Sequence, residues 1–153
     1  MDVVIGRPFN HIGPMQDAGF AIASFTRQIA RIECGLEPPV LHVGNLDAER
    51  DVTDVRDVVA AYETIMERAS RGSVYNICSG RTWPIRALLD QLLRHSSKPI
   101  AVEVDPARFR PNDVPRIQGD FSSLRKDLGW VPTTTIEETL RDTLHWWRSV
   151  TSR

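Results

Sequence analysis

Two arginines lie in irregular, turn-rich sequence and carry the chemistry to hold a phosphate. Arg50 follows Asp47 and Glu49, and Arg110 precedes a Pro-Asn-Asp sequence in a segment without helical or strand periodicity. A guanidinium offers a planar fork of donors that suits phosphate oxygens, and each such bond nets roughly 1.5 to 3 kcal/mol when sheltered from water. Two of them closing on a diphosphate would be a strong anchor. For either arginine alone, pairing with a neighbouring carboxylate is the competing interpretation.

A second stretch with chemical potential is Gly6–Pro14, which follows the apolar run Val3–Ile5 with hardly any linker. In open α/β sheets the carboxyl ends of the strands are where ligands bind. Pro8 fixes its own φ and a Gly-Pro pair closes the stretch, so Asn10 and His11 are expected to be held in place by this turn-like segment. A strand followed by an ordinary loop remains the alternative for this segment alone.

The elements that must position these residues alternate between helix and strand, which predicts an α/β or mixed domain. Asp17, Asp54 and Thr135 are predicted to begin helices, with Glu138 completing a capping box at Thr135. The polar stretch 44–51 is expected to lie outside the core. The expected strands are 3–5, 40–43, 74–78 and 100–104. Two expected helices have both ends defined, Asp17 to Gly35 and Ser122 to Leu128, and three more begin at Asp54, after the turn 79–82 and at Thr135. A long loop is expected over 105–119.

The helix that begins at Asp54 is expected to bury one apolar face. Its apolar residues recur at spacings that suit such a face. They are Val58, Val59, Tyr62, Ile65 and Met66.

Composition limits the classes of partner. The chain has 153 residues, is 41% hydrophobic and 25% charged, and has a net charge of −1, which indicates a globular protein with a real core and gives no reason to expect nucleic acid or membrane as partner. No metal-ligand spacing is present, and Cys34 and Cys78 are expected to be buried free thiols, as in the cytoplasm. Because the chain begins almost at once in an apolar strand, we expect it to be the second part of a longer protein.

The usual signatures of nucleotide and dinucleotide chemistry are missing from this sequence. There is no Gly-x-Gly-x-x-Gly and no Walker loop, and neither Tyr62 nor Tyr75 has a lysine four residues later. This chain therefore shows no complete catalytic machinery.

Four motifs in order nevertheless resemble the carboxyl half of extended short-chain dehydrogenase/reductases that act on nucleotide sugars. Within that family the sequence is most similar to GDP-mannose 4,6-dehydratases and to the GDP-6-deoxy-4-keto-mannose reductases. The resemblance spans nearly the whole chain. Its motifs are Arg-Pro-Phe-Asn-His-Ile-Gly-Pro at 7–14, Gly-Asn-Leu-Asp-Ala-Glu-Arg-Asp at 44–51 followed by Thr-Asp-Val-Arg-Asp, Tyr-Asn-Ile-Cys-Ser-Gly at 75–80, and Arg-Pro-Asn-Asp-Val at 110–114 with Gln-Gly-Asp and Gly-Trp downstream.

The resemblance implies roles for particular residues. Arg50 and Arg110 look like the two arginines that grip the diphosphate and nucleotide, and Asn10 like the asparagine that contacts substrate near its diphosphate. Asp113 is similar to an acidic residue that holds the nucleoside, and Phe25 and Gln28 fall where relatives contact guanine, although many dehydratases carry lysine at the Gln28 position. The cofactor, NAD or NADP, would lie near Pro8, Phe9, Asn10 and His11.

The fold class implied by the resemblance is the C-terminal part of a Rossmann-like α/β enzyme, mostly its smaller mixed α/β substrate-binding domain. Residues 1–14 would belong to the dinucleotide-binding domain and 15–153 mainly to the substrate domain, with about 51–80 returning to the Rossmann sheet. The implied function is that of a GDP-mannose 4,6-dehydratase or GDP-4-keto-6-deoxy-mannose reductase, in which this chain supplies the GDP-sugar-binding half. The partner implied for the complete enzyme is a second copy, in a homodimer. A non-catalytic nucleotide-binding module, or an incomplete fragment without activity of its own, is the alternative.

Overall fold

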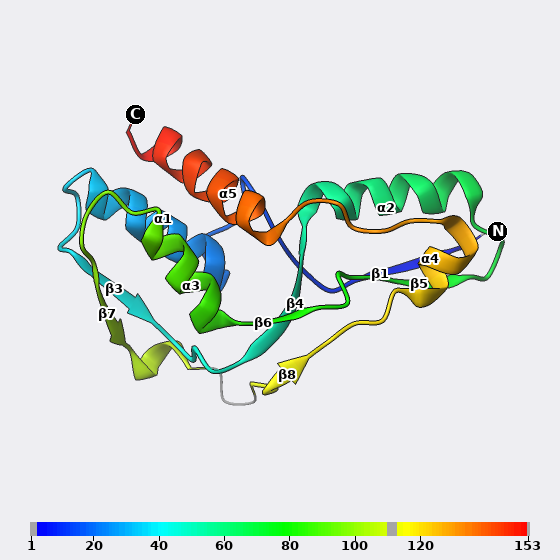
Figure 1. Cartoon of the computed structure of the whole chain (residues 1–153), viewed down its shortest axis with the longest axis horizontal. Helices are drawn as coiled ribbons and strands as arrows, with labels where there is room; N and C mark the ends of the chain where they lie inside the picture. The colour runs from blue at the N-terminus through cyan, green and yellow to red at the C-terminus, as the bar shows by residue number, and fades with distance from the viewer. Residues whose placement is uncertain (1–2, 110–112, 153) are drawn as a thin grey trace.

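The computed structural model describes residues 3–109 and 113–152, and its elements form an elongated molecule with two lobes (Figure 1). We call the first the helical lobe; it consists of α1 (Ala21–Glu33), β3 (Val40–Val43), α3 (Ile85–Arg94), β7 (Ala101–Val104) and α5 (Ile136–Thr151). We call the second the strand lobe; it consists of β1 (Ile5–Pro8), α2 (Val55–Arg68), β5 (Val74–Ile77) and α4 (Ser122–Leu128). The elements between the lobes are β2 (Asn10–Ile12), β4 (Glu49–Asp54), β6 (Thr82–Pro84), β8 (Arg116–Ile117) and the short 3-10 helix η1 (Pro106–Arg108).

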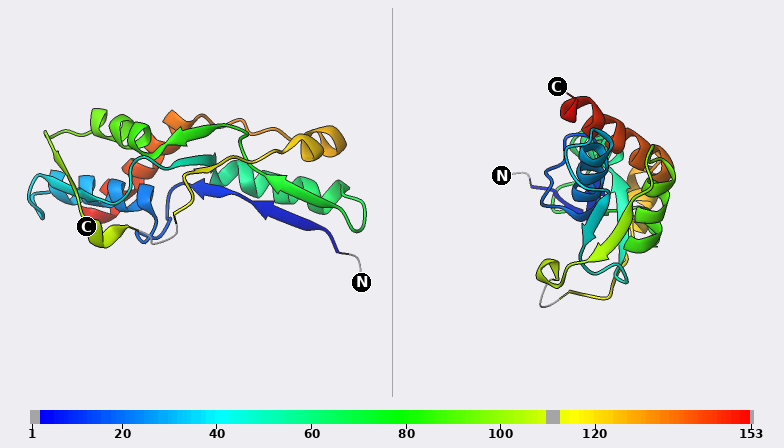
Figure 2. Two further views of the ribbon diagram at one scale, coloured as in Figure 1. Left: turned by 90° about the horizontal axis from the view of Figure 1, so that it is seen from below. Right: turned by 90° about the vertical axis from the view of Figure 1, so that its left-hand side faces the viewer.

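Strand β4 connects the two lobes. It pairs with β2 in parallel, with Asn10 opposite Val52, and its first residues pair with β6 in antiparallel and with β8 in parallel. The strand lobe has a separate parallel pair, β1 with β5, and the helical lobe has another, β3 with β7. Seen from below, β1 runs along the margin of the molecule toward the N-terminus (Figure 2, left).

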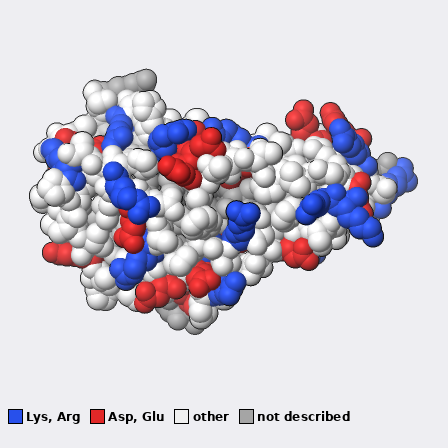
Figure 3. Space-filling view, viewed as in Figure 1, with Lys and Arg blue, Asp and Glu red and all other residues white. Residues whose placement is uncertain are grey.

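Charged side chains of both signs are interspersed over the face shown in Figure 3. This distribution agrees with a net charge of −1 that comes from 19 basic and 20 acidic residues. A protein that tracks a phosphate backbone instead gathers lysine and arginine on one face.

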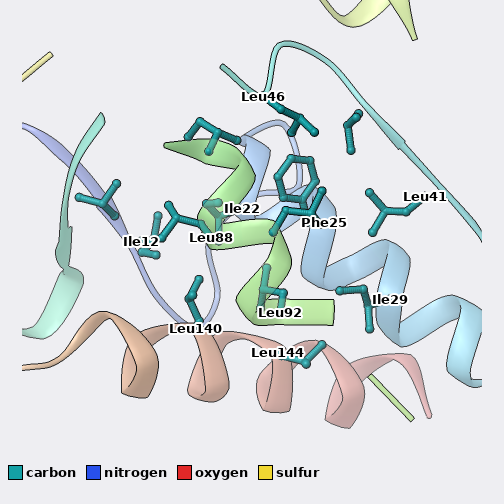
Figure 4. Packing of buried hydrophobic residues seen from close by; sticks show 14 of the residues in the cluster. Ile12, Ile22, Phe25, Ile29, Leu41, Leu46, Leu88, Leu92, Leu140 and Leu144 are labelled. Carbon is teal, nitrogen blue, oxygen red and sulfur yellow. The ribbon is translucent and has the colours of Figure 1, made fainter. Parts of the chain in front are cut away.

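The helical lobe packs around a core that all three of its helices share. Leu140 and Leu144 of α5 point toward Leu92 of α3 and Ile29 of α1 (Figure 4), and these four side chains are at most 1% exposed. The predicted capping box begins α5, because the Thr135 hydroxyl and the Glu138 carboxylate each bond the other's backbone N–H.

A paired arginine and carboxylate join the C-terminal ends of two helices of this lobe. The Nε and Nη2 groups of Arg148 donate to the two carboxylate oxygens of Glu33, each at 2.7 Å, and Nη2 also donates to the His95 carbonyl at 2.7 Å. Parallel bonds of this kind fix the relative orientation of two side chains. They hold the end of α5 against the end of α1.

The strand lobe has a smaller core that is covered on one side. Val58 and Ile65 of α2 pack with Tyr75, Ile77 and the side chains of α4 and Trp130. The expected apolar face of α2 was only half right: Val59, Tyr62 and Met66 are exposed, with Met66 at 87%. The Tyr62 ring still lies against Gly6, where an added Cβ would stand 2.9 Å from it, whereas Val59 and Met66 are more than half exposed.

Several predictions of local structure were wrong, including the loop over 105–119, which contains η1 and β8. Gly6–Pro8 continue strand β1, because their backbone groups pair with β5. Phe20, not Asp17, is the residue that precedes the first helical turn, and the Asp17 carboxylate instead accepts the Gly19 N–H at 2.7 Å. Residues 82–84 form strand β6, so Pro84 directly precedes α3.

The polar stretch 44–51 also differs from its prediction, because its second half enters strand β4. Asp51 is fully buried, and its carboxylate accepts the backbone N–H groups of Ser79, Gly80 and Gly119 and the Ser79 hydroxyl. A buried carboxylate is stable only when its oxygens are satisfied in this way. Asp51 therefore holds two segments, distant in sequence, against β4.

The two cysteines are free, as predicted, but only Cys78 is buried. Burial, and next the nearby charge of Asp51, raises the pKa of the Cys78 thiol to about 12. Cys34 is exposed at the end of α1, where the sequence predicted burial. No helix in the described ranges is long and apolar enough to cross a bilayer.

Candidate functional site

A cavity of about 800 Å³ lies between the helical lobe and the connecting strands, bounded by β2, the first half of α1, the end of β3 and strand β4. Its volume is in the range of sites that hold a small ligand. Six of the residues that the sequence singled out line it: Phe9, Asn10, His11, Phe25, Arg50 and Asp113.

The pairing of β2 with β4 brings Asn10 and Arg50 near each other. Asn10 lies opposite Val52, so that Arg50 is two residues from the strand position that faces Asn10. Phe25 comes from the buried face of α1 and is 3% exposed. The cavity therefore has an apolar floor from the helix and polar groups from the strand ends.

Arg50 is held by its own chain. One of its terminal amino groups donates to the carbonyls of Glu49, at 2.8 Å, and Pro115, at 3.5 Å. The other forms an ion pair with Asp113. The two side chains of this pair are 14% and 22% exposed, so bulk water screens their charges only in part.

Two further cavity residues were not identified from the sequence. Asn45 donates to the second carboxylate oxygen of Asp113 at 3.0 Å, and its own oxygen accepts the Asp47 N–H at 2.9 Å. Arg108 belongs to η1, which packs so closely that a Cβ on Gly44 would stand 2.7 Å from the Arg108 carbonyl oxygen. The glycine at the end of β3 was the available signal, because close approach of two backbones requires the absence of a side chain.

Two of the predicted site residues, Gln28 and Pro8, stand apart from this group. The Gln28 amide accepts the His42 N–H at 2.9 Å and donates to the His42 carbonyl at 3.2 Å, so it bridges α1 to β3. Pro8 ends strand β1 and does not line the cavity. Arg110 lies outside the described residues. Their roles stay predictions, as do the ligand contacts of the six residues inside the cavity.

The end of the cavity near β2 is shaped by a tight turn. The Gln16 N–H donates to the Gly13 carbonyl at 3.4 Å, and the Gln16 amide donates to the His11 carbonyl at 2.8 Å. Met15, within this turn, has a φ of 70°, a conformation in which residues other than glycine are uncommon. The turn holds the exposed Met15 side chain at the cavity.

The arrangement can bind, but it holds no complete set of catalytic groups. The titratable side chains that line it are His11, His42, Arg50, Arg108 and Asp113. No pair of a nucleophile and a general base, and no tyrosine with a lysine, occurs among these lining residues. Two guanidinium groups, three amides and an apolar floor are the chemistry of anion and ring recognition.

Proteins of similar sequence carry the names of GDP-sugar dehydratases and reductases. The profile of the GDP-mannose 4,6 dehydratase family matches residues 1–143. GDP-6-deoxy-D-mannose reductase of Pseudomonas aeruginosa is 42% identical over 147 residues, which are 96% of this chain and 48% of that protein. GDP-mannose 4,6-dehydratase of Vibrio cholerae is 31% identical over 159 residues, covering 85% of this chain and 42% of that protein.

Solved structures agree. The P. aeruginosa protein RMD in complex with NADPH superposes with a TM-score of 0.91 at 40% identity, over 97% of this chain and 49% of that one. UDP-glucose 4-epimerase of Thermotoga maritima with UDP-glucose gives a TM-score of 0.80 at 29% identity, over 98% of this chain and 47% of that one. These likenesses confirm the predicted Rossmann-like α/β fold class, and the chain spans about half the length of the relatives it matches.

Proposed function

Since the chain belongs to the GDP-mannose 4,6-dehydratase family, as its motifs predicted, we propose that it is the GDP-sugar-binding half of a sugar-nucleotide dehydratase or reductase. The observation that carries this proposal is the meeting of Asn10, Phe25, Arg50 and Asp113 in one cavity, although they come from four segments of the chain. The relative with the highest identity given above is a reductase, which favours a 4-keto-6-deoxy sugar as the substrate.

In this proposal each residue has a task that suits its chemistry. Arg50 binds the diphosphate through its charge, and Asn10 offers an amide to the same region. Phe25 presents an apolar surface to the base, and the Asp113 carboxylate can accept hydrogen bonds from hydroxyls of the nucleoside. Binding energy from this remote part of the substrate places the hexose for reaction, so a loss of grip lowers rate as well as affinity.

The cofactor is proposed to be NADP or NAD, which exchanges a hydride with the sugar in the complete enzyme. The residues of this chain fit only a side contact with it, from Phe9 to His11 at the edge of the cavity. Gly6 is no part of a phosphate cradle, because a Cβ there would stand 2.9 Å from the Tyr62 ring. The groups that hold the cofactor's pyrophosphate, and those that move the hydroxyl proton, would come from the other half of the enzyme.

The domain assignment belongs to the same proposal. Strand β1, from the segment 1–14, pairs with β5, from the segment 51–80, in the parallel manner of a Rossmann sheet. Ile5 and Val74 in this pair are 45% and 40% exposed, which supports a sheet that continues onto further strands. The free thiols support a cytoplasmic location, and a homodimer is proposed for the complete enzyme.

Titration calorimetry of the purified protein with GDP-mannose, GDP and NADP(H) tests the proposal. We expect GDP and GDP-mannose to bind. Binding of neither would contradict the proposal and favour a fragment without activity of its own. GDP binding by a protein whose coding sequence encodes no glycine-rich loop and no Tyr-x-x-x-Lys would favour the non-catalytic module.

Substitution of Arg50 tests the site itself. Arg50→Ala should weaken GDP-sugar binding by roughly 1.5 to 3 kcal/mol, because a charged hydrogen-bond donor is lost from a sheltered position. Arg141→Ala, on the exposed side of α5, removes the same charge and should leave binding unchanged. Arg110→Ala is expected to act like Arg50→Ala. Normal binding by the Arg50 and Arg110 variants would refute the assignment.

A further inference from the structure

The partner of Arg50 in the cavity is itself an anion. The Asp113 carboxylate pairs with one terminal amino group of Arg50 through one oxygen, and its other oxygen accepts the Asn45 amide at 3.0 Å. Both oxygens are therefore engaged, in a place where water has limited access. A carboxylate in this position imitates a phosphate, since guanidinium groups bind the two with the same geometry.

Few donors of Arg50 remain for another anion. A guanidinium has five N–H groups. Three are directed at Glu49, Pro115 and Asp113, which leaves the Nε–H and one N–H of the terminal amino group that faces Asp113. A phosphate bound through those two donors alone would lie next to the negative charge of Asp113, which repels it.

We propose that Asp113 occupies the anion position at Arg50 in the free cavity, so that a phosphate binds there only by displacing this carboxylate. When bare phosphate or pyrophosphate binds, a bond to Arg50 forms, but the bond between Arg50 and Asp113 is broken. A nucleoside diphosphate also brings hydroxyl groups, to which the displaced carboxylate can bind. Asp113 thereby selects nucleotides over simple phosphates, an inference that rests on the proposed GDP-sugar function for the same cavity.

The test compares inorganic pyrophosphate with GDP on the purified protein and its variants by titration calorimetry. Asp113→Asn keeps the size of the side chain and removes its charge, and Asp113→Ser removes the charge without an amide that could bond Arg50. Glu67→Gln, at an exposed position on α2, changes the net charge by the same amount far from the cavity and is the control. Thermal unfolding of each variant checks that it is folded.

We expect both Asp113 variants to bind pyrophosphate at least about fivefold more tightly than the Glu67→Gln control, and GDP no more tightly, as follows from the loss of a competing charged bond. Pyrophosphate affinity that is unchanged or reduced in both Asp113 variants would overturn the inference, as would pyrophosphate binding by none of the proteins. Failure of the unaltered protein to bind GDP-mannose or GDP counts against the proposed function instead. The pyrophosphate series decides the role of Asp113 separately.

Discussion

The two lobes differ in how completely they cover their own apolar surface. In the helical lobe, three helices enclose a core in which Ile29, Leu92 and Leu140 have no exposed area (Figure 4). In the strand lobe, a two-stranded sheet has α2 and α4 packed on it (Figure 1), and Val59 and Met66 on α2 are more than half exposed. A pair of strands is marginal by itself, since sheets with a hydrophobic face gain stability from three or more strands or from packing against helices.

The difference shows which part of this chain covers its own apolar surface. The helical lobe supplies its own packing and carries α1 and β3, which border the cavity. The strand lobe exposes apolar side chains of the kind that other parts of a protein cover. The cavity is lined by the well-packed helical lobe and by the strands that connect it to the strand lobe, so its helical side should be the more rigid.

The largest expected effect compares equivalent leucines in the two cores. Leu140→Ala should lower the free energy of unfolding by about 4 kcal/mol, because the tightly enclosed site cannot collapse around the cavity that is left. Leu124→Ala, in α4 and equally buried, should cost only about 2 to 3 kcal/mol, since the smaller core can relax. Urea denaturation of both variants measures the two losses. Equal losses would contradict the comparison of the lobes.

A smaller effect concerns the bond between Glu33 and Arg148 in the helical lobe. Burial raises the pKa of Glu33, but bonds from Arg148 and the Ser97 N–H outweigh it, so the pKa lies below the ordinary value of 4.5. A carboxyl whose pKa is lowered by folding stabilises the fold above its ordinary pKa, and this stability is lost as the pH falls through the lowered pKa.

Arg148→Gln should therefore cost about 1 kcal/mol at neutral pH, a value typical of a favourable ion pair. The difference from the unaltered protein should shrink as the pH falls below 4.5, where Glu33 becomes protonated. Urea denaturation across this pH range measures the difference. Arg141→Gln on the same helix should show no such trend, and a pH-independent cost for Arg148→Gln would rule out the ion pair as its cause.

The smallest effect is expected on the exposed side of the strand lobe. Met66→Ser should change the free energy of unfolding by less than about 0.5 kcal/mol, because this side chain is 87% exposed. Ile65→Ser, the neighbouring position on the buried side of α2, should be clearly destabilising. Comparable losses from the two substitutions would mean that other residues of this chain cover Met66, which would contradict its exposure.

Features with a local signal could be predicted from the sequence. The capping box of Thr135 and Glu138, the cap at Asp54 and the helix from Ser122 to Leu128 depend on residues within one or two turns, and the structure contains all three. The strand at 40–43 was also predicted correctly, since a short, mostly apolar run between a Pro-Pro pair and a glycine leaves few alternatives.

Features that depend on distant partners could not be predicted. Strand β4 begins with charged residues, and Asp51 is buried there because donors 28 to 68 positions away satisfy it. The extended conformation of Gly6–Pro8 likewise depends on β5. In the cavity, the motifs indicated which residues matter, but the ion pair between Arg50 and Asp113 follows from the packing of a loop against strand β4 and not from local spacing.

The contrast between the two thiols has a practical consequence for spectroscopy. Cys78 is buried and its proton is tightly held, so a maleimide reagent should leave it intact in the folded protein. Cys34 projects from the end of α1, on the lobe that supplies its own packing. A single fluorophore or spin label can thus be attached at one known position without engineering, where it would report the motion of the whole lobe as a ligand enters.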